Sequence, residues 1–221
     1  MRFLLLFMIS LAVIACNRDS RSSADAIDTL DSASRIRLND TSGLFHITCW
    51  GVGEIELSDN YSIVELKVGK ENISQDSLFL EGTFERIITT LWKGQPEEII
   101  INWFEKEPPF KTIKYLELSN ENSKYHFENG IRIGSRLKDI EQLNTKSINL
   151  YGFGWDYGGT FIDFGKGKLQ NDMPCFGGVF NVEAGAPESL MGDKPFNSSD
   201  PAFKNHKTVL KVIRVKNTDL D

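Results

Sequence analysis

The sequence predicts an α+β fold, a mostly antiparallel β-sheet with one or two short helices. Nine short runs from residue 43 onward are rich in β-branched residues or alternate apolar with polar positions, which is the pattern of strands. The turn sequence Gly94-Gln95-Pro96 separates two of these runs and predicts a hairpin. A single segment near residue 140 has clear helical periodicity, so helices are the minor component.

The predicted strands are spread over the whole of this region. They cover residues 43–50, 62–68, 83–92, 98–104, 111–118, 147–153, 160–164, 176–182 and 208–215. The predicted helix begins at Ser135, a good N-cap residue, and ends near Asn144. Its apolar side consists of Leu137, Ile140 and Leu143, and the residues between them are polar.

The first sixteen residues have the layout of an export signal. Arg2 supplies a positive charge ahead of an apolar run over residues 3–15, and Val13-Ile14-Ala15-Cys16 resembles a bacterial lipobox. As a helix the run would extend about 20 Å, short of the roughly 30 Å hydrocarbon core, so a signal peptide is favoured over a permanent span. We expect removal of residues 1–15 and acylation of Cys16, since two or three acyl chains give stable anchoring. An ordinary signal peptide with an incidental cysteine is the alternative.

Residues 16–42 form the predicted lipidated N-terminus and a disordered tether. The segment is rich in Ser, Asp and Arg and has no aromatic residue, so it buries too little apolar surface to offset the entropy of ordering. Residues 43–221 are predicted to form a single globular α+β domain, long enough to bury a real core. The expected location is a membrane of the cell envelope. The outer membrane is favoured, with the domain facing the periplasm or the cell surface.

The balance of charge argues against nucleic acid as a partner. The chain has 25 Lys plus Arg against 31 Asp plus Glu, a formal net charge of -6. It has no basic stripe that could replace the counterions of nucleic-acid phosphates. The expected partners are the lipid bilayer, through acylated Cys16, and an envelope protein or a glycan.

Two cysteines remain once Cys16 carries lipid. Cys49 lies in the strand-like run LFHITCW and Cys175 in the turn-like run DMPCFGG. In an oxidising compartment the two could pair. The sequence does not place them within bonding distance, so a disulfide and two buried free thiols both stay open.

Part of the domain resembles a known group of proteins. Residues 129–159 (NGIRIGSRLKDIEQLNTKSINLYGFGWDYGG), with Leu190-Met191-Gly192-Asp193 and the strand at 209–215, are similar to an uncharacterised family of small Gram-negative lipoproteins. The resemblance extends over about residues 91–215, is most specific at 151–159, and implies export and lipidation but no activity. More distantly, GIRIGSRLKDIEQL resembles the strand-to-helix unit of outer-membrane-assembly-type small lipoproteins and of β-lactamase-inhibitor-like modules, which implies a binding or scaffolding role. This chain has Asn144-Thr145 where those proteins have Gly-Pro.

The segment at residues 151–159 (YGFGWDYGG) has the most unusual composition of the chain. In one interpretation it is a bulged hairpin whose first three aromatic residues alternate into the core. In the other it is a ligand surface formed by Trp155, Asp156 and Tyr157, in which glycines allow close approach and the carboxylate accepts hydrogen bonds from sugar hydroxyls. The clean period of two favours the core interpretation.

No catalytic or metal-binding pattern is present in the sequence. His46, His126 and His206 are far apart along the chain. Zinc-ligand spacings, nucleophile elbows, phosphate-binding loops and dinucleotide fingerprints do not occur. Neighbouring carboxylates such as Glu97 and Glu98 are more simply a solvated turn than an acid–base or Ca²⁺ site. We therefore expect no catalytic residue, no cofactor and no metal.

These observations leave distinct function classes. The favoured one is a non-enzymatic binding or scaffolding domain on an envelope lipoprotein. The alternative is a carbohydrate-directed hydrolase or carbohydrate-binding module that uses residues 151–159. The hydrolase would need two carboxylates about 5 to 10 Å apart in a cleft beside Trp155. A purely structural envelope protein is the third.

Overall fold

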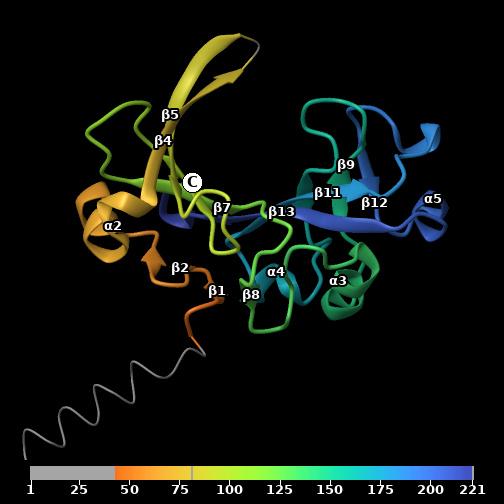
Figure 1. The fold of residues 1–221 in the computed structure, drawn as a ribbon. Coiled ribbons are helices and arrows are strands. Elements are labelled where there is room, and N and C mark those ends of the chain that lie inside the picture. Colours follow the sequence, from red (N-terminus) through yellow and green to blue (C-terminus); the bar gives the residue numbers. More distant parts are fainter. Residues whose placement is uncertain (1–42, 81, 221) are drawn as a thin grey trace, which may run out of the picture. The chain divides into compact units, whose positions relative to one another are not determined.

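The computed structural model describes residues 43–80 and 82–220, and there the predicted α+β class is confirmed. Thirteen strands in this part of the chain form three sheets, in which one strand pairing is parallel and the others are antiparallel (Figure 1). The same residues contain four α-helices rather than one or two, and α4 (Leu169–Asp172) and α5 (Pro201–Lys204) are single turns. The predicted signal peptide, Cys16 and the tether lie outside the described residues.

The main sheet has six strands in the order β11-β13-β7-β6-β5-β4, and all its neighbours are antiparallel. These strands are β4 (Ile73–Leu80), β5 (Thr83–Leu91), β6 (Ile99–Trp103), β7 (Ile113–Leu118), β11 (Phe176–Val182) and β13 (Thr208–Lys216). The last strand, β13, lies between β7 and β11 and so joins parts of the chain that are far apart in sequence. The hairpin predicted at Gly94-Gln95-Pro96 is confirmed, because β5 and β6 pair across it.

One face of the main sheet carries the core. Ile101, Leu116 and Val215 lie opposite one another on β6, β7 and β13 and have no exposed surface. Burying side chains of this size stabilises the fold by about 1.5 to 3 kcal/mol each. Trp103 is also fully buried, and its indole N–H donates to Thr89 Oγ1 at 2.8 Å. The polar atom of the largest core side chain is therefore satisfied.

Two smaller sheets complete the domain. One contains β3 (Ile55–Glu56), β2 (Gly51–Val52), β1 (His46–Thr48) and β8 (His126–Phe127), and β1 and β8 are the parallel pair. The other contains β10 (Phe161–Asp163), β9 (Asn149–Tyr151) and β12 (Pro195–Asn197). A disulfide joins Cys49, just after β1, to Cys175, just before β11. It links the first small sheet to the main sheet.

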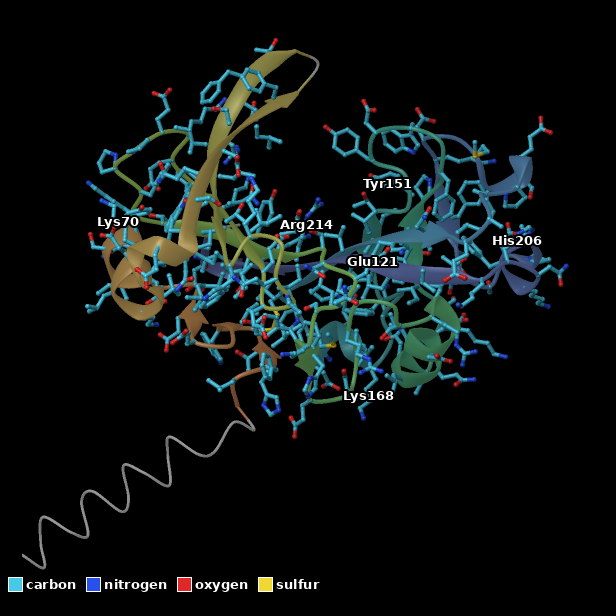
Figure 2. The ribbon with its side chains drawn as sticks, viewed as in Figure 1. Lys70, Glu121, Tyr151, Lys168, His206 and Arg214 are labelled. Atoms are coloured by element: carbon cyan, nitrogen blue, oxygen red, sulfur yellow. A yellow bond between two sulfur atoms is a disulfide. The ribbon has the colours of Figure 1, made fainter. Side chains whose placement is uncertain are left out.

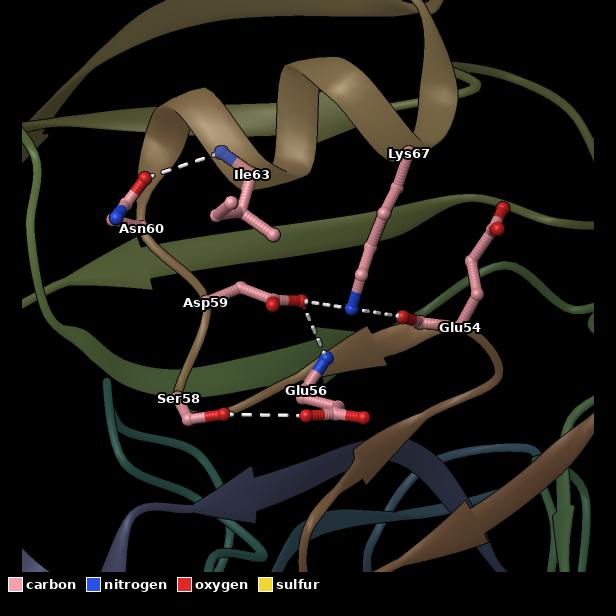
Figure 3. A network of polar contacts seen from close by, with 7 residues as sticks. All are labelled: Glu54, Glu56, Ser58, Asp59, Asn60, Ile63 and Lys67. Carbon is pink, nitrogen blue, oxygen red and sulfur yellow. Dashed lines mark hydrogen bonds and ion pairs between the residues drawn. The ribbon is translucent and has the colours of Figure 1, made fainter.

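The run at residues 62–68, predicted as a strand, is instead part of the helix α2 (Tyr61–Val68). Both ends of this helix are capped. Asn60 Oδ1 accepts a hydrogen bond from the backbone N–H of Ile63 at 3.1 Å (Figure 3), and Gly69 ends the helix with a positive φ of 80°. The caps satisfy backbone N–H and C=O groups at the two ends of the helix. Their contribution outweighs the strand preference of the β-branched residues in this run.

Packing and an ion pair hold α2 against the domain. Val64 and Val68, one helical turn apart, are its buried residues. Asp59, only 6% exposed, accepts hydrogen bonds from Lys67 Nζ at 2.7 Å and from the backbone N–H of Glu56 at 2.8 Å (Figure 3). These partners offset the cost of burying the carboxylate, and they fix the end of α2 to the turn that precedes it.

The helix predicted near residue 140 is present as α3 (Leu137–Asn144). Leu137 and Ile140 are buried as predicted, but Leu143 is 41% exposed. The helical period of 3.6 places residue 144, rather than 143, on the buried side after residue 140. Ser135 is not the N-cap, because α3 begins at Leu137, one residue later than a cap at Ser135 requires. The hydroxyl of Ser135 instead accepts a hydrogen bond from the backbone N–H of Arg132.

The strand β4 has no counterpart among the predicted strands. It is an edge strand that pairs with β5 along its whole length, and its sequence ISQDSLFL mixes polar and apolar residues. The β4–β5 hairpin projects beyond the rest of the main sheet (Figure 1). Near its tip, Phe79 is 57% exposed and contacts Phe84 edge-on. The cross-strand aromatic pair stabilises a hairpin that has little other packing.

Candidate ligand-binding surface

Residues 151–159 leave their sheet early. β9 ends at Tyr151, and residues 154–159 form a turn before β10 begins. Gly154 and Gly159 have positive φ angles of 85° and 73°, and a Cβ on Gly159 would lie 2.0 Å from the backbone oxygen of Phe180. Only glycine fits this path. The predicted hairpin is present, because β9 and β10 pair antiparallel with a register irregularity between Phe161 and Asp163. Residues 152–160 are its connecting loop rather than strand, and the far end of that loop rests on β11.

The aromatic residues of this loop lie progressively farther from the core. Phe153 is buried, Trp155 is half-buried and Tyr157 is 60% exposed. The indole N–H of Trp155 donates to the backbone oxygen of Gly152 at 2.9 Å, and the Trp155 ring contacts Tyr151 and Tyr157 edge-on at centroid distances of 5.7 and 5.3 Å. We call Tyr151, Trp155 and Tyr157 the aromatic cluster. Of the three aromatic residues in the core interpretation, only Phe153 is buried, because Tyr151 and Trp155 are partly exposed.

An open hollow of about 860 Å³ lies beside the aromatic cluster. The loop contributes Trp155 and Asp156 to its lining, and the strands β11 and β13 contribute Val179, Asn181 and Lys211. Its volume lies within the range of small-molecule sites. The hollow therefore combines an aromatic side with amide, carboxylate and ammonium groups. Of the predicted ligand-surface residues, Trp155 and Asp156 line it and Tyr157 does not.

An ion pair lies in the lining of this hollow. Lys211 Nζ of β13 donates to the carboxylate of Glu121, which follows β7 in the chain and is labelled in Figure 2. That hydrogen bond and the charge of Lys211 lower the pKa of Glu121, so its carboxyl is ionised at neutral pH. Asp156, the other carboxylate of the lining, is exposed and has no ion pair within the described part of the chain. It is free to accept hydrogen bonds from a ligand.

Two histidines that are far apart in the sequence are adjacent in the structure. The parallel pairing of β1 and β8 places His46 opposite His126, with ring centroids 5.2 Å apart. Only long-range strand pairing brings them together, so no spacing in the sequence indicated it. In residues 43–80 and 82–220 no group of three or more His, Cys, Asp and Glu side chains is placed to hold a metal ion.

The remaining candidate groups have structural roles. Glu97 pairs with Lys124 Nζ at 2.7 Å, and a hydrogen bond from that ammonium lowers the pKa of Glu97. Glu98 accepts a hydrogen bond from the backbone N–H of Gly94 and so closes the β5–β6 turn. The two cysteines of the domain are joined to each other, so neither thiol can act as a nucleophile.

No protein-family model, curated protein or solved structure matches this chain significantly. The resemblance to small Gram-negative lipoproteins therefore stays a prediction. No helix in residues 43–80 and 82–220 is long and apolar enough to cross a membrane. The geometry of the aromatic cluster and its hollow is the basis for a functional proposal.

Proposed function

We propose that this chain is an exported lipoprotein, held on a cell-envelope membrane by acyl chains on Cys16, and that its domain works by binding a glycan rather than by catalysis. Support for the anchor comes from the sequence alone: the charged start, the apolar run at residues 3–15 and the lipobox-like Val13-Ile14-Ala15-Cys16. Support for binding comes from the aromatic cluster.

The exposure of the aromatic cluster is the observation that carries the binding function. Tyr157 offers a large apolar face to solvent, and the partly buried Trp155 beside it lines a hollow that has both polar and apolar residues. A sugar ring matches this surface because its C–H face can cover an aromatic ring while its hydroxyls hydrogen-bond to groups such as Asp156 and Asn181. A saccharide of the envelope is therefore the ligand class that the surface fits best.

The charges of the same hollow favour binding over hydrolysis. A glycosidase needs two carboxyls beside the scissile bond, one of them protonated at working pH through a raised pKa. Of the residues that line the hollow, Glu121 and Asp156 carry carboxyls. Lys211 lowers the pKa of Glu121, so this carboxyl lacks the raised pKa of a general acid.

The anchor is tested by metabolic labelling. Cells given a clickable fatty acid should label the parent protein, and Cys16→Ser should abolish the label because only a thiol forms the thioether. Equal labelling of the Cys16→Ser protein would reject lipidation at this residue.

Binding is tested by co-sedimentation of the full-length protein, kept in detergent, with purified peptidoglycan sacculi. We expect the variant Asp156→Asn/Tyr157→Ala to lose about tenfold in affinity, the size of one good contact. Trp50→Ala is the matched control, because Trp50 is 78% exposed and lies outside the hollow. Equal retention of parent, double variant and control would reject this surface as the glycan site.

A further inference from the structure

A second hollow, of about 920 Å³, lies between α3, α5 and the start of β13. It shares no lining residue with the hollow beside the aromatic cluster. His206, labelled in Figure 2 just beyond α5, is part of its lining. The charged residues of its lining are Arg136, Lys138, Lys204, Lys207 and Glu141.

The hollow is basic although the chain as a whole is acidic, with a net charge of -6. Arg136 is bound to Asp139 and Lys207 to Glu183, and the side chains of both pairs are substantially exposed. Neither Asp139 nor Glu183 lines the hollow. Lys138 and Lys204 make no ion pair among the described residues. The single carboxylate of the lining, Glu141, accepts a hydrogen bond from Ser198 Oγ at 2.9 Å. An excess of positive charge is thus concentrated in one concave place, where it attracts anions.

A buried hydroxyl in the lining lacks a partner. Thr208, the first residue of β13, is 4% exposed, and its Oγ1 makes no hydrogen bond to any described residue. Burying a hydroxyl without a hydrogen bond costs about 1 to 3 kcal/mol. Orphaned groups of this kind are uncommon in native proteins. Because Thr208 lines the hollow, a small shift of neighbouring side chains would open its Oγ1 to an acceptor oxygen of a ligand.

The fold holds these groups in place through its backbone. Asp200 caps α5 by accepting a hydrogen bond from the backbone N–H of Ala202 at 2.9 Å, which sets the position of Lys204 one turn later. On the other side, the backbone N–H of Leu210 donates to the backbone oxygen of Ser135 at 2.9 Å and ties the start of α3 to β13. The start of α3 is thus tied to β13 by a hydrogen bond, and α5 comes directly before β13 in the chain.

We propose that this basic hollow binds a phosphate-bearing ligand. A phosphate ester has close to two negative charges and three strong acceptor oxygens, which suits the ammonium groups of Lys138 and Lys204 and the hydroxyl of Thr208. The planar fork of Arg136 is already taken up by the carboxylate of Asp139. A free phosphate ester and the headgroup of a phospholipid have the same recognisable chemistry. The site stands apart from the glycan surface and does not depend on it.

The test titrates the full-length protein in dodecylmaltoside with sodium pyrophosphate by isothermal calorimetry. We expect Lys138→Gln/Lys204→Gln to weaken binding by about a hundredfold, roughly tenfold for each charge-assisted contact. Lys70→Gln/Lys111→Gln, which removes the same charge outside the hollow, should leave the affinity within about twofold, because exposed charges beyond a Debye length are screened. Equal weakening by both double variants would show general charge attraction and overturn the site.

Thr208→Val gives a second readout. Valine has nearly the shape of threonine, so the variant should be at least as stable as the parent when no ligand is present, and it should bind pyrophosphate several-fold more weakly. Unchanged affinity would show that the hydroxyl does not meet the ligand and would contradict the proposal.

A further pair of titrations separates the two sources of phosphate. In one, glycerol 1-phosphate replaces pyrophosphate, and in the other the micelles contain phosphatidylglycerol. If the parent binds glycerol 1-phosphate and Lys138→Gln/Lys204→Gln does not, the ligand is a soluble phosphate ester. If the parent binds the phosphatidylglycerol micelles and the double variant does not, the ligand is a lipid headgroup. No binding of either kind, together with no binding of pyrophosphate, would overturn the proposal.

Discussion

At the scale of single residues, backbone geometry rather than residue type decides which aromatic side chains are buried. Phe153, Trp155 and Tyr157 stand two apart, so a period of two predicted one shared face for all of them. Positive φ at Gly154 turns the chain out of the strand before that face can form, and only Phe153 reaches the core. The glycines were visible in the sequence, but their φ angles were not. The composition therefore drew attention to this segment, but its period of two wrongly predicted a core position for Trp155.

The first prediction compares two aromatics of this loop. Phe153→Ala should lower the free energy of unfolding by about 3 to 5 kcal/mol, because it empties a buried site. Tyr157→Ala should cost less than about 1 kcal/mol, because that ring is 60% exposed. Urea unfolding of both variants measures the difference, and similar losses for the two would contradict the burial gradient.

The second prediction concerns Tyr125 at high pH. Burial, helped by the negative charges of Glu97 and Glu54, raises the pKa of Tyr125 from 10.0 to about 12. The folded state then holds this proton more tightly than the unfolded state does, so stability is undiminished below about pH 10 and falls as the pH rises from 10 towards 12. Tyrosinate absorbance of the parent and of Tyr125→Phe should differ only near pH 12. A difference that is already half complete at pH 10 would show an exposed phenol.

At the scale of elements, the sequence was most informative where a run of mainly apolar residues lies between residues that end a strand, such as proline and glycine. The strand β11 has the predicted bounds because an apolar run begins after Pro174 and ends before Gly185. The helix α2 was missed because Val64 and Val68 satisfy a helical and a strand period alike, and Asn60 was not recognised as its cap. The edge strand β4 was missed because one side of it faces solvent, so polar residues interrupt its pattern.

The third prediction tests the orientation of α3. Leu137→Ala and Ile140→Ala should each lower stability by about 2 to 4 kcal/mol, because both side chains are buried. Leu143→Ala should change it by less than about 1 kcal/mol, since that side chain is 41% exposed. Chemical denaturation of the three variants is the measurement. A loss at Leu143 as large as that at Ile140 would place the helix in a different rotation.

At the scale of the whole molecule, long-range pairing assembles what the sequence leaves scattered. The strand β13 lies between β7 and β11 and so brings Lys211 to Glu121 and both to the loop that holds Asp156. The same kind of pairing places His46 beside His126. Fold class follows from local patterns, but strand order depends on contacts between distant residues, so neither hollow could be predicted from the sequence.

The fourth prediction concerns the disulfide between Cys49 and Cys175. It closes a loop with a sequence separation of 126 residues, so its loss should lower stability by about 2 to 5 kcal/mol, chiefly through the greater freedom of the unfolded chain. Urea unfolding of the parent with and without reductant measures the effect, and Cys49→Ser/Cys175→Ser should reproduce it. A midpoint that reductant leaves unchanged would contradict the bond.

The most direct test of the binding surface is the retention of Trp155→Ala on peptidoglycan sacculi. Because Trp155 is half-buried and held by one hydrogen bond, the variant should stay folded and lose only about 1 to 2 kcal/mol of stability. Its retention should fall at least about tenfold, since the central ring of the aromatic cluster is gone. A folded Trp155→Ala protein that binds sacculi as well as the parent, or a variant that no longer folds, would contradict the assignment of this cluster as a ligand surface.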